Sequence, residues 1–146
     1  MSGHTLALLE GYARLLAEAG VGIYRASGIY TAAETGITIT SVPDTPDRIV
    51  CLTPYDVDSS SGTSNVVEGL QVRIRAGTDP RPTLDLADEV FKVLHMRERT
   101  VVGGVHVALS WRQSWDWIGA DARRRQELTA NYYLRLTRRD SPHLID

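Results

Sequence analysis

Val105-His106-Val107-Ala108-Leu109-Ser110-Trp111 and Leu128-Thr129-Ala130-Asn131-Tyr132-Tyr133-Leu134-Arg135-Leu136-Thr137 decide the fold, and both lie between Gly104 and Arg138. In each stretch the apolar residues occupy alternate positions, which is the pattern of a strand with one buried face. They are Val105, Val107, Leu109 and Trp111 in the first stretch, and Leu128, Ala130, Tyr132, Leu134 and Leu136 in the second. The pattern predicts two long, central strands.

The segment that joins these strands, residues 112–127, is too long for a tight hairpin loop, so we expect an ordered, functional connection. Trp115 and Trp117 either cap the open end of the sheet or project into a partner, since tryptophan and arginine carry much of the energy of protein interfaces. The run Arg123-Arg124-Arg125 is either a solvated turn or a contact for phosphates, and nearby acidic residues partly offset its positive charge. All five side chains are candidate interface residues.

The N-terminal half of the chain predicts one helix and two strands. The expected elements are an amphipathic helix from Leu6 to Ala19, a short extended piece within residues 22–27, an edge strand at Gly36–Thr40, an apolar strand from Arg48 to Thr53 that Pro54 stops, and a polar loop from Tyr55 to Asn65. We expect this loop to be disordered or to contact a neighbouring subunit.

The next part of the chain predicts a strand over residues 68–76 and a helix capped by Thr83. Thr100–Val102 is either a short strand or a turn. Arg73 and Arg75 share the non-core face of the first strand, and like charges on one face repel unless partners are supplied. We therefore expect both arginines at a subunit contact.

These elements indicate an α+β fold: one domain over residues 1–146, with a single mixed, mostly antiparallel sheet and two helices packed on one face. A chain of 146 residues is long enough to bury one core without disulfides. No stretch of the sequence predicts a membrane span or a secretory signal.

The charge is small overall but unevenly placed. The net charge of -2 and the pI near 6.1 argue against a protein that mainly binds phosphates. Residues 1–70 carry three arginines and eight acidic residues, whereas residues 71–146 carry thirteen basic and ten acidic residues. This asymmetry either reflects composition alone or marks two different surfaces that meet head to tail in a ring.

Nothing in the sequence predicts catalysis, a metal or a cofactor. The four histidines lack metal-site spacing, and neither a nucleophile elbow nor a glycine-rich phosphate loop is present. Cys51 lies in an apolar run and is expected to be a buried small hydrophobe in a reducing compartment. The remaining enzymatic alternative is a small hydrolase that uses His106 with a nearby carboxylate.

The order of several pieces resembles the tail terminator family of long-tailed bacteriophages, also called minor capsid or tail completion proteins. The resemblance rests on the strand Gly69–Arg75, the helix Asp85–His95, the turn Gly119–Arg125 and the triplet Asn131-Tyr132-Tyr133. It is best between residues 35 and 138 and concerns residues that shape the fold.

The resemblance implies a virion subunit without enzymatic activity. Such a subunit forms a ring, expected to be hexameric, at the head-proximal end of the tail tube, stops tube polymerisation and docks to the head–tail connector. Genomic DNA passes through the lumen without sequence-specific binding, and assembly takes place in the host cytoplasm. The alternative within this class is a head-closure or head–tail adaptor protein.

Overall fold

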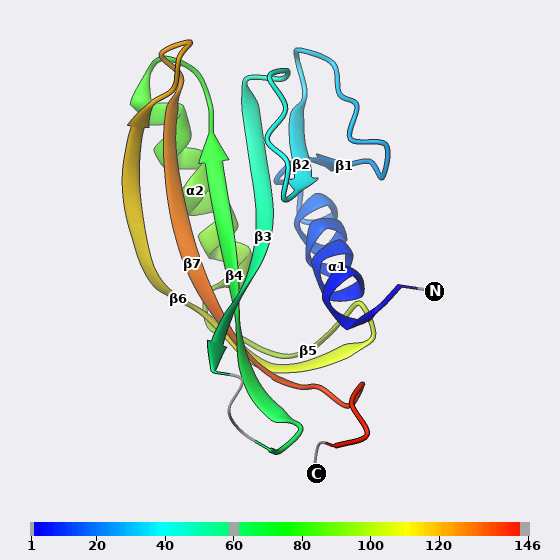
Figure 1. The fold of residues 1–146 in the computed structure, drawn as a ribbon. Helices are drawn as coiled ribbons and strands as arrows, with labels where there is room; N and C mark the ends of the chain where they lie inside the picture. The colour runs from blue at the N-terminus through cyan, green and yellow to red at the C-terminus, as the bar shows by residue number, and fades with distance from the viewer. Residues whose placement is uncertain (1, 59–61, 144–146) are drawn as a thin grey trace.

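The computed structural model describes residues 2–58 and 62–143, which form two helices and one sheet of seven strands (Figure 1). The elements are α1 His4–Glu18, β1 Ile23–Tyr24, β2 Thr35–Ile39, β3 Arg48–Asp58, β4 Asn65–Arg75, α2 Pro80–Leu94, β5 Arg97–Val102, β6 Val105–Ala120 and β7 Gln126–Thr137. The strands lie side by side in the order β1-β2-β3-β4-β7-β6-β5.

The sheet is mixed and curls into a half-barrel (Figure 1). Strand β2 runs parallel to both β1 and β3, whereas the other four neighbouring pairs are antiparallel. The α+β class and the mixed sheet are confirmed, but the expectation that the sheet is mostly antiparallel is corrected, because β2 pairs in parallel on both of its sides. The strand at residues 36–40 is not at the edge of the sheet, because β1 covers its outer side.

Both helices pack on one face of the sheet, and they divide it between them. Helix α1 lies against β1, β2 and β3 and, because the sheet curls, also against β5, and α2 lies against β4, β7 and β6. Tyr12 and Leu16 of α1 belong to the same buried cluster as Leu86 of α2. The predicted alternation of β7 is confirmed, since its five apolar residues are all buried in this cluster.

The predicted long connection between the last two strands is wrong. Strand β6 continues to Ala120, and only the turn Asp121–Arg125 separates it from β7. The pairing of β6 with β7 is irregular at three places, the first between Val107 and Leu109. An irregular residue moves the following side chains to the other face. Trp111 therefore lies opposite Tyr133 on the face away from the helices, in an edge-to-face contact, and not in the core as its alternation predicts.

Pro54 does not end β3, which continues to Asp58. Strand β2 pairs with β3 only as far as Leu52, so Pro54 lies where β3 has no neighbour on that side. Proline, which has no N–H to donate, is tolerated at such an edge. Residues 55–58 and 65 of the predicted loop are therefore strand, and residues 59–61, which lie within it, are outside the described residues.

Helix α2 begins earlier than its expected cap at Thr83. Asp79 is the N-cap and accepts a hydrogen bond from the N–H of Arg81, and Pro80 is the first helical residue. Thr83 is instead completely buried, and its hydroxyl donates to the carbonyl of Gln126 in β7. Thr83 thus ties the start of α2 to the sheet.

Candidate functional site

The second half of β6 presents an exposed apolar surface. Strand β5 pairs with β6 only up to Ser110, so residues 111–120 have β7 as their only strand neighbour among the described residues. Trp115 is 45% exposed and Trp117 is 40% exposed, and Ile118 of β6 and Leu84 of α2 are exposed as well. We call these four residues the tryptophan surface.

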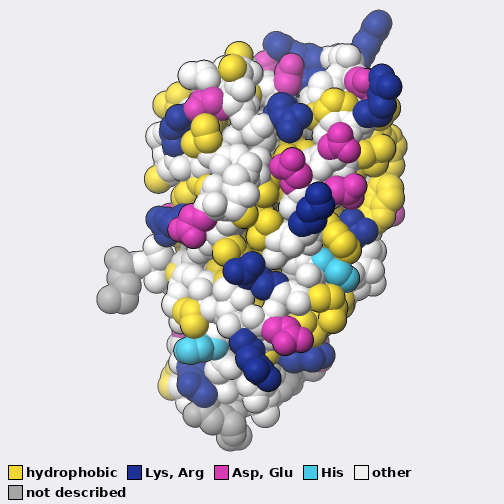
Figure 2. Space-filling view, turned by 180° about the vertical axis from the view of Figure 1, so that it is seen from behind, with side chains coloured by type: hydrophobic (Ala, Val, Ile, Leu, Met, Phe, Trp, Pro, Cys, Tyr) yellow, Lys and Arg dark blue, Asp and Glu magenta, His cyan; other side chains and the backbone are white. Residues whose placement is uncertain are grey.

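The tryptophan surface borders a small hollow between β6 and α2. Leu84, Asp88, Arg112 and Trp115 are among the residues that line its volume of about 90 Å³. The guanidinium of Arg112 lies 4.3 Å from the ring centre of Phe91 in α2, a cation–π contact that holds this side chain against the helix. From behind, apolar side chains gather along the β6 side of the molecule (Figure 2). The surface is therefore apolar at its centre and charged at its rim.

The turn between β6 and β7 is organised by Asp121. Its carboxylate accepts hydrogen bonds from the N–H groups of Arg123 and Arg125 at 2.9 and 2.8 Å, and from the Arg125 guanidinium at 2.9 Å. Burial would raise the pKa of Asp121, but these hydrogen bonds outweigh it and lower that pKa. Arg124 adopts a positive φ of 63° and is exposed at the turn. The arginine run is thus a defined turn.

Arg125 is buried and joins this turn to residues 43–47. Its side chain is only 7% exposed, donates to the carbonyl of Asp44 and forms ion pairs with the carboxylates of Asp44 and Asp47 at 3.1 and 3.3 Å. Arg123 also pairs with Asp44, at 2.9 Å, but its side chain is 67% exposed. Arg125 therefore has a structural role within the chain, whereas Arg123 and Arg124 face solvent.

Arg73 and Arg75 have partners within the chain. Arg73 makes two hydrogen bonds to the buried carboxylate of Glu127 on β7 at 2.9 and 3.1 Å. Arg75 is buried and donates to four main-chain carbonyls of residues 43–47 at 2.6–3.3 Å. Acceptors within the chain thus offset the repulsion between the two arginines, and no neighbouring subunit is needed for this. Their place at a subunit contact stays a prediction.

The opposite side of the molecule also carries exposed apolar residues. Ile23 of β1 is 38% exposed and Ile29 in the following loop is 75% exposed. We call these two residues the isoleucine surface. The loop is held by the Arg25 guanidinium, which donates two hydrogen bonds of 2.7 Å to Glu34 and lowers the pKa of that carboxyl to about 2. The isoleucine surface is therefore presented by an organised loop.

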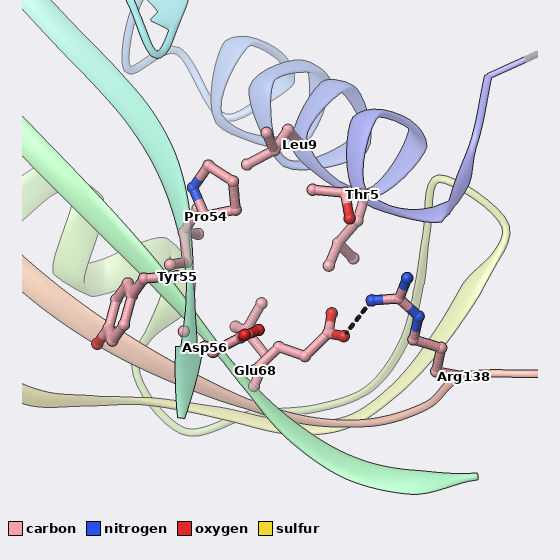
Figure 3. A pocket seen from close by; sticks show the side chains of 11 residues that line it. Thr5, Leu9, Pro54, Tyr55, Asp56, Glu68 and Arg138 are labelled. Carbon is pink, nitrogen blue, oxygen red and sulfur yellow. Dashed lines mark hydrogen bonds and ion pairs between the residues drawn. The ribbon is translucent and has the colours of Figure 1, made fainter. Parts of the chain in front are cut away.

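A cavity of about 300 Å³ lies between the first turns of α1 and the paired strands β3 and β4 (Figure 3). Its apolar wall includes Leu9 and Pro54, and its polar wall includes Asp56 and Glu68. The carboxylate of Glu68 lies 2.9 Å from both the His4 ring and the Arg138 guanidinium. Glu68 therefore ties the start of α1 and the residue after β7 to β4.

Glu68 and Asp56 are predicted to respond oppositely to loss of charge. They lie directly opposite each other on β4 and β3, and like charges in that position repel. Glu68→Gln should lower the free energy of unfolding by about 1–2 kcal/mol, because two charge-assisted hydrogen bonds are weakened. Asp56→Asn should leave it unchanged or raise it by up to about 0.5 kcal/mol. Urea unfolding of the two variants checks this, and an equal loss in both would contradict it.

Among residues 2–58 and 62–143, no group of three or more His, Cys, Asp or Glu side chains is arranged to hold a metal ion. His106 is exposed on β6 and does not line the cavity at α1, whereas His95 accepts a hydrogen bond from the N–H of Arg112. Cys51 is buried, as expected. In the described part of the chain, neither helix has the length and hydropathy to span a membrane.

The sequence patterns did not predict several residues of the tryptophan surface, of the cavity at α1 and of the isoleucine surface. Trp115 and Trp117 were identified by residue type, but Leu84 comes beside Trp115 only through the packing of β6 on α2. Asp56 and Glu68 are brought together by a strand register that no single-sequence pattern reveals. Ile29 is an isolated apolar residue in a loop, for which the sequence offers no signal.

Comparison with known proteins identifies the family. Residues 15–138 match the model of a family described as bacteriophage tail terminator protein, which spans most of the described fold. The chain belongs to the tail terminator family. It is therefore a tail-related structural protein of a phage-like virion, and the resemblance seen in its sequence is confirmed. No curated protein matches this tail terminator family member.

Solved structures support the same fold. Eleven chains match, and one of them comes from a structure titled "Virion of native gene transfer agent (GTA) particle". That chain is 15% identical, with a TM-score of 0.55, and the match covers 68% of the tail terminator chain and 78% of the virion chain. At this identity the likeness shows a shared fold and not a shared set of contacts.

Proposed function

We propose that the protein is a tail terminator that acts as a ring, most simply a hexamer, at the head-proximal end of the tail tube. The ring stops tube polymerisation and joins the tail to the head–tail connector, and genomic DNA passes through its lumen without sequence-specific binding. The subunits assemble in the host cytoplasm and remain in the virion. The function is asymmetric binding and not turnover of a substrate.

The observation that carries this proposal is the family match over residues 15–138. The surface of the molecule is compatible with it, because exposed apolar side chains lie near β1 and also on the far part of β6. Exposed apolar patches on a soluble protein commonly mark interaction sites. A terminator needs such sites for copies of itself and for the tube, together with a face that accepts no further tube subunit.

Two measurements test the proposal. Light scattering of the purified chain, alone and with its tail tube protein, should give a particle of about six times the 16.1 kDa subunit mass. A particle that stays monomeric at high concentration and also with the tube present would contradict a ring. In the phage, deletion of the gene should give overlong tails in electron micrographs. Heads that leak DNA, with tails of normal length, would indicate a head-closure protein instead.

A further inference from the structure

Strand β6 has a free edge beyond its pairing with β5. Strand β5 is the last strand of the sheet, and it pairs with β6 only as far as Ser110. Among the described residues, no strand therefore lies beside the outer edge of residues 111–120 (Figure 1). Every one of these ten residues is exposed or half-buried. A free strand edge presents main-chain N–H and C=O groups with which a further strand can pair.

The main-chain groups of Trp115 and Trp117 point to this free edge. The N–H of Arg112 points away from β7, because it donates a hydrogen bond of 3.1 Å to the ring of His95 at the end of α2. Residues that bond to the neighbouring strand alternate with residues that do not. Both tryptophans share the direction of Arg112, because the three residues lie opposite alternate positions of β7, which are Tyr132, Ala130 and Leu128.

The side chains beside this edge differ between the two faces of the sheet. Trp115 and Trp117 lie opposite buried residues of β7 and therefore on the helix face, where Leu84 of α2 adds exposed apolar surface. Asp116 lies opposite Thr129 and therefore on the face away from the helices. Among the described residues, its carboxylate has no hydrogen-bond or ion-pair partner. The edge is thus apolar on one face and negatively charged on the other.

The regular part of this edge is short. The pairing of β6 with β7 is irregular between Arg112 and Ser114 and again between Trp117 and Gly119, so regular pairing is limited to residues 114–117. Irregular residues bend and twist a strand, and they limit how far a further strand can follow it. The edge therefore fits a short extended segment and not the long edge of another sheet.

We propose that residues 114–117 of β6 bind a short extended segment of another virion protein, which pairs with the free edge as an additional strand. The segment alternates apolar and basic residues. Its apolar side chains pack beside Trp115 and Trp117, and its basic side chains lie beside the carboxylate of Asp116. This inference deepens the proposed function, on which it rests for the source of the segment.

A second copy of the chain fits this edge less well. At the other end of the sheet β1 offers only two residues, and β5 is irregular, because Arg99 has a positive φ of 48° and is skipped in the pairing with β6. Two copies of β6 that pair about Asp116 would bring like charges together, which is unfavourable. Such a two-fold contact would also close after two subunits, so it could not build a ring.

A peptide titration of the full chain tests the proposal. The probe is a short blocked peptide of alternating valine and lysine, and the comparison peptide has glutamate in place of lysine. The lysine peptide should bind at least about threefold more tightly, because Asp116 attracts lysine and repels glutamate. At saturation, NMR should show hydrogen exchange at least about tenfold slower at the N–H groups of Trp115 and Trp117. Exchange at Ser114 and Asp116, whose N–H groups face β7, should not change.

Methylated peptides separate strand pairing from contact through side chains alone. One lysine peptide is methylated on the main-chain nitrogens of its valines, and the other on those of its lysines. In an added strand, the N–H groups of only one of these two sets face β6. One methylated peptide should therefore lose binding and the other should retain it. Equal effects of the two methylations would overturn the proposed pairing.

A charge reversal tests the role of Asp116. The variant Asp116→Lys should reverse the preference, so that the glutamate peptide binds more tightly than the lysine peptide. Glu89→Lys is the matched control, because it makes the same change of charge at an exposed position of α2 and should keep the original preference. Should Asp116→Lys melt early, Asp116→Asn replaces it and should abolish the preference. A preference that survives at residue 116 would contradict the inference.

The outcomes also separate this inference from the proposed function. If about 1 mM lysine peptide leaves hydrogen exchange at Trp115 and Trp117 unchanged, the inference is wrong although the ring stands. If exchange there slows when the chain is concentrated without peptide, a second copy occupies the edge and the assigned occupant is wrong. If the chain stays monomeric with the tail tube present but binds the lysine peptide as described, the ring fails and the edge site stands.

Discussion

Replacing Arg125 with methionine is expected to lower the free energy of unfolding by about 2–4 kcal/mol. The buried guanidinium connects three carboxylates, those of Asp44, Asp47 and Asp121, and also satisfies the main-chain carbonyl of Asp44. Methionine keeps the apolar stem of the side chain but leaves these acceptors without their donor. The turn of residues 43–47 would then be held to the sheet by Arg75 alone of the two arginines.

Arg123→Met is the matched control, because Arg123 belongs to the same turn and pairs with the same Asp44. Its side chain is largely exposed, and exposed ion pairs contribute about 0–1 kcal/mol. Chemical denaturation of both variants measures the two losses, with the same dependence of the free energy of unfolding on denaturant concentration used for both. Equal losses of stability in the two variants would show that burial of Arg125 does not decide its contribution.

The partners of the buried arginines could not be read from the sequence. The alternation of residues 68–76 correctly places Arg73 and Arg75 on the face away from the helices, but it does not reveal what covers that face. The acceptors of Arg75 are carbonyls of a turn far away in the chain, and carbonyls have no sequence signature. The inferred repulsion between the two arginines was physically sound but incomplete, because Glu127 and this turn supply the missing partners.

Strands with strict alternation were predictable, and irregular ones were not. The apolar residues of β7 keep one phase from Leu128 to Leu136, so both its existence and its buried face follow from the sequence. Strand β6 changes phase where its pairing is irregular, and the pattern of apolar residues breaks at those places. Residues 112–120 therefore looked like a loop, and Trp111 was assigned to the wrong face. Trp115 and Trp117 lie opposite Ala130 and Leu128 after the second irregularity, and they are exposed where β5 no longer pairs with β6.

The parallel pairing of β1, β2 and β3 could also not be predicted from the sequence. A short alternating stretch such as residues 35–39 gives the same pattern in parallel and antiparallel sheets. The direction of pairing depends on the route of the chain through the loops between these strands.

Gly103 shows how α1 is positioned over the β5–β6 turn. This glycine has a positive φ of 57°, and a methyl group on it would overlap the main-chain carbonyl of Ala7 in α1. A methyl group on Gly11 would in turn overlap the main chain of Gly103. The sequence left Thr100–Val102, just before Gly103-Gly104, open between a strand and a turn; it is the end of β5, and the sequence does not reveal that α1 contacts the glycines that follow. Two glycines thus allow a helix to approach a hairpin turn to main-chain distance.

Gly103→Ala is accordingly expected to lower the free energy of unfolding by about 2–5 kcal/mol, through an unfavourable φ and a clash with main-chain atoms that cannot rotate away. Gly104→Ala is the matched control, because Gly104 also has a positive φ, 79°, but a methyl group there meets open space. Its loss should be only about 1 kcal/mol. Thermal and urea unfolding measure both variants, and a similar loss in the two would mean that φ alone, and not the contact with α1, requires glycine at residue 103.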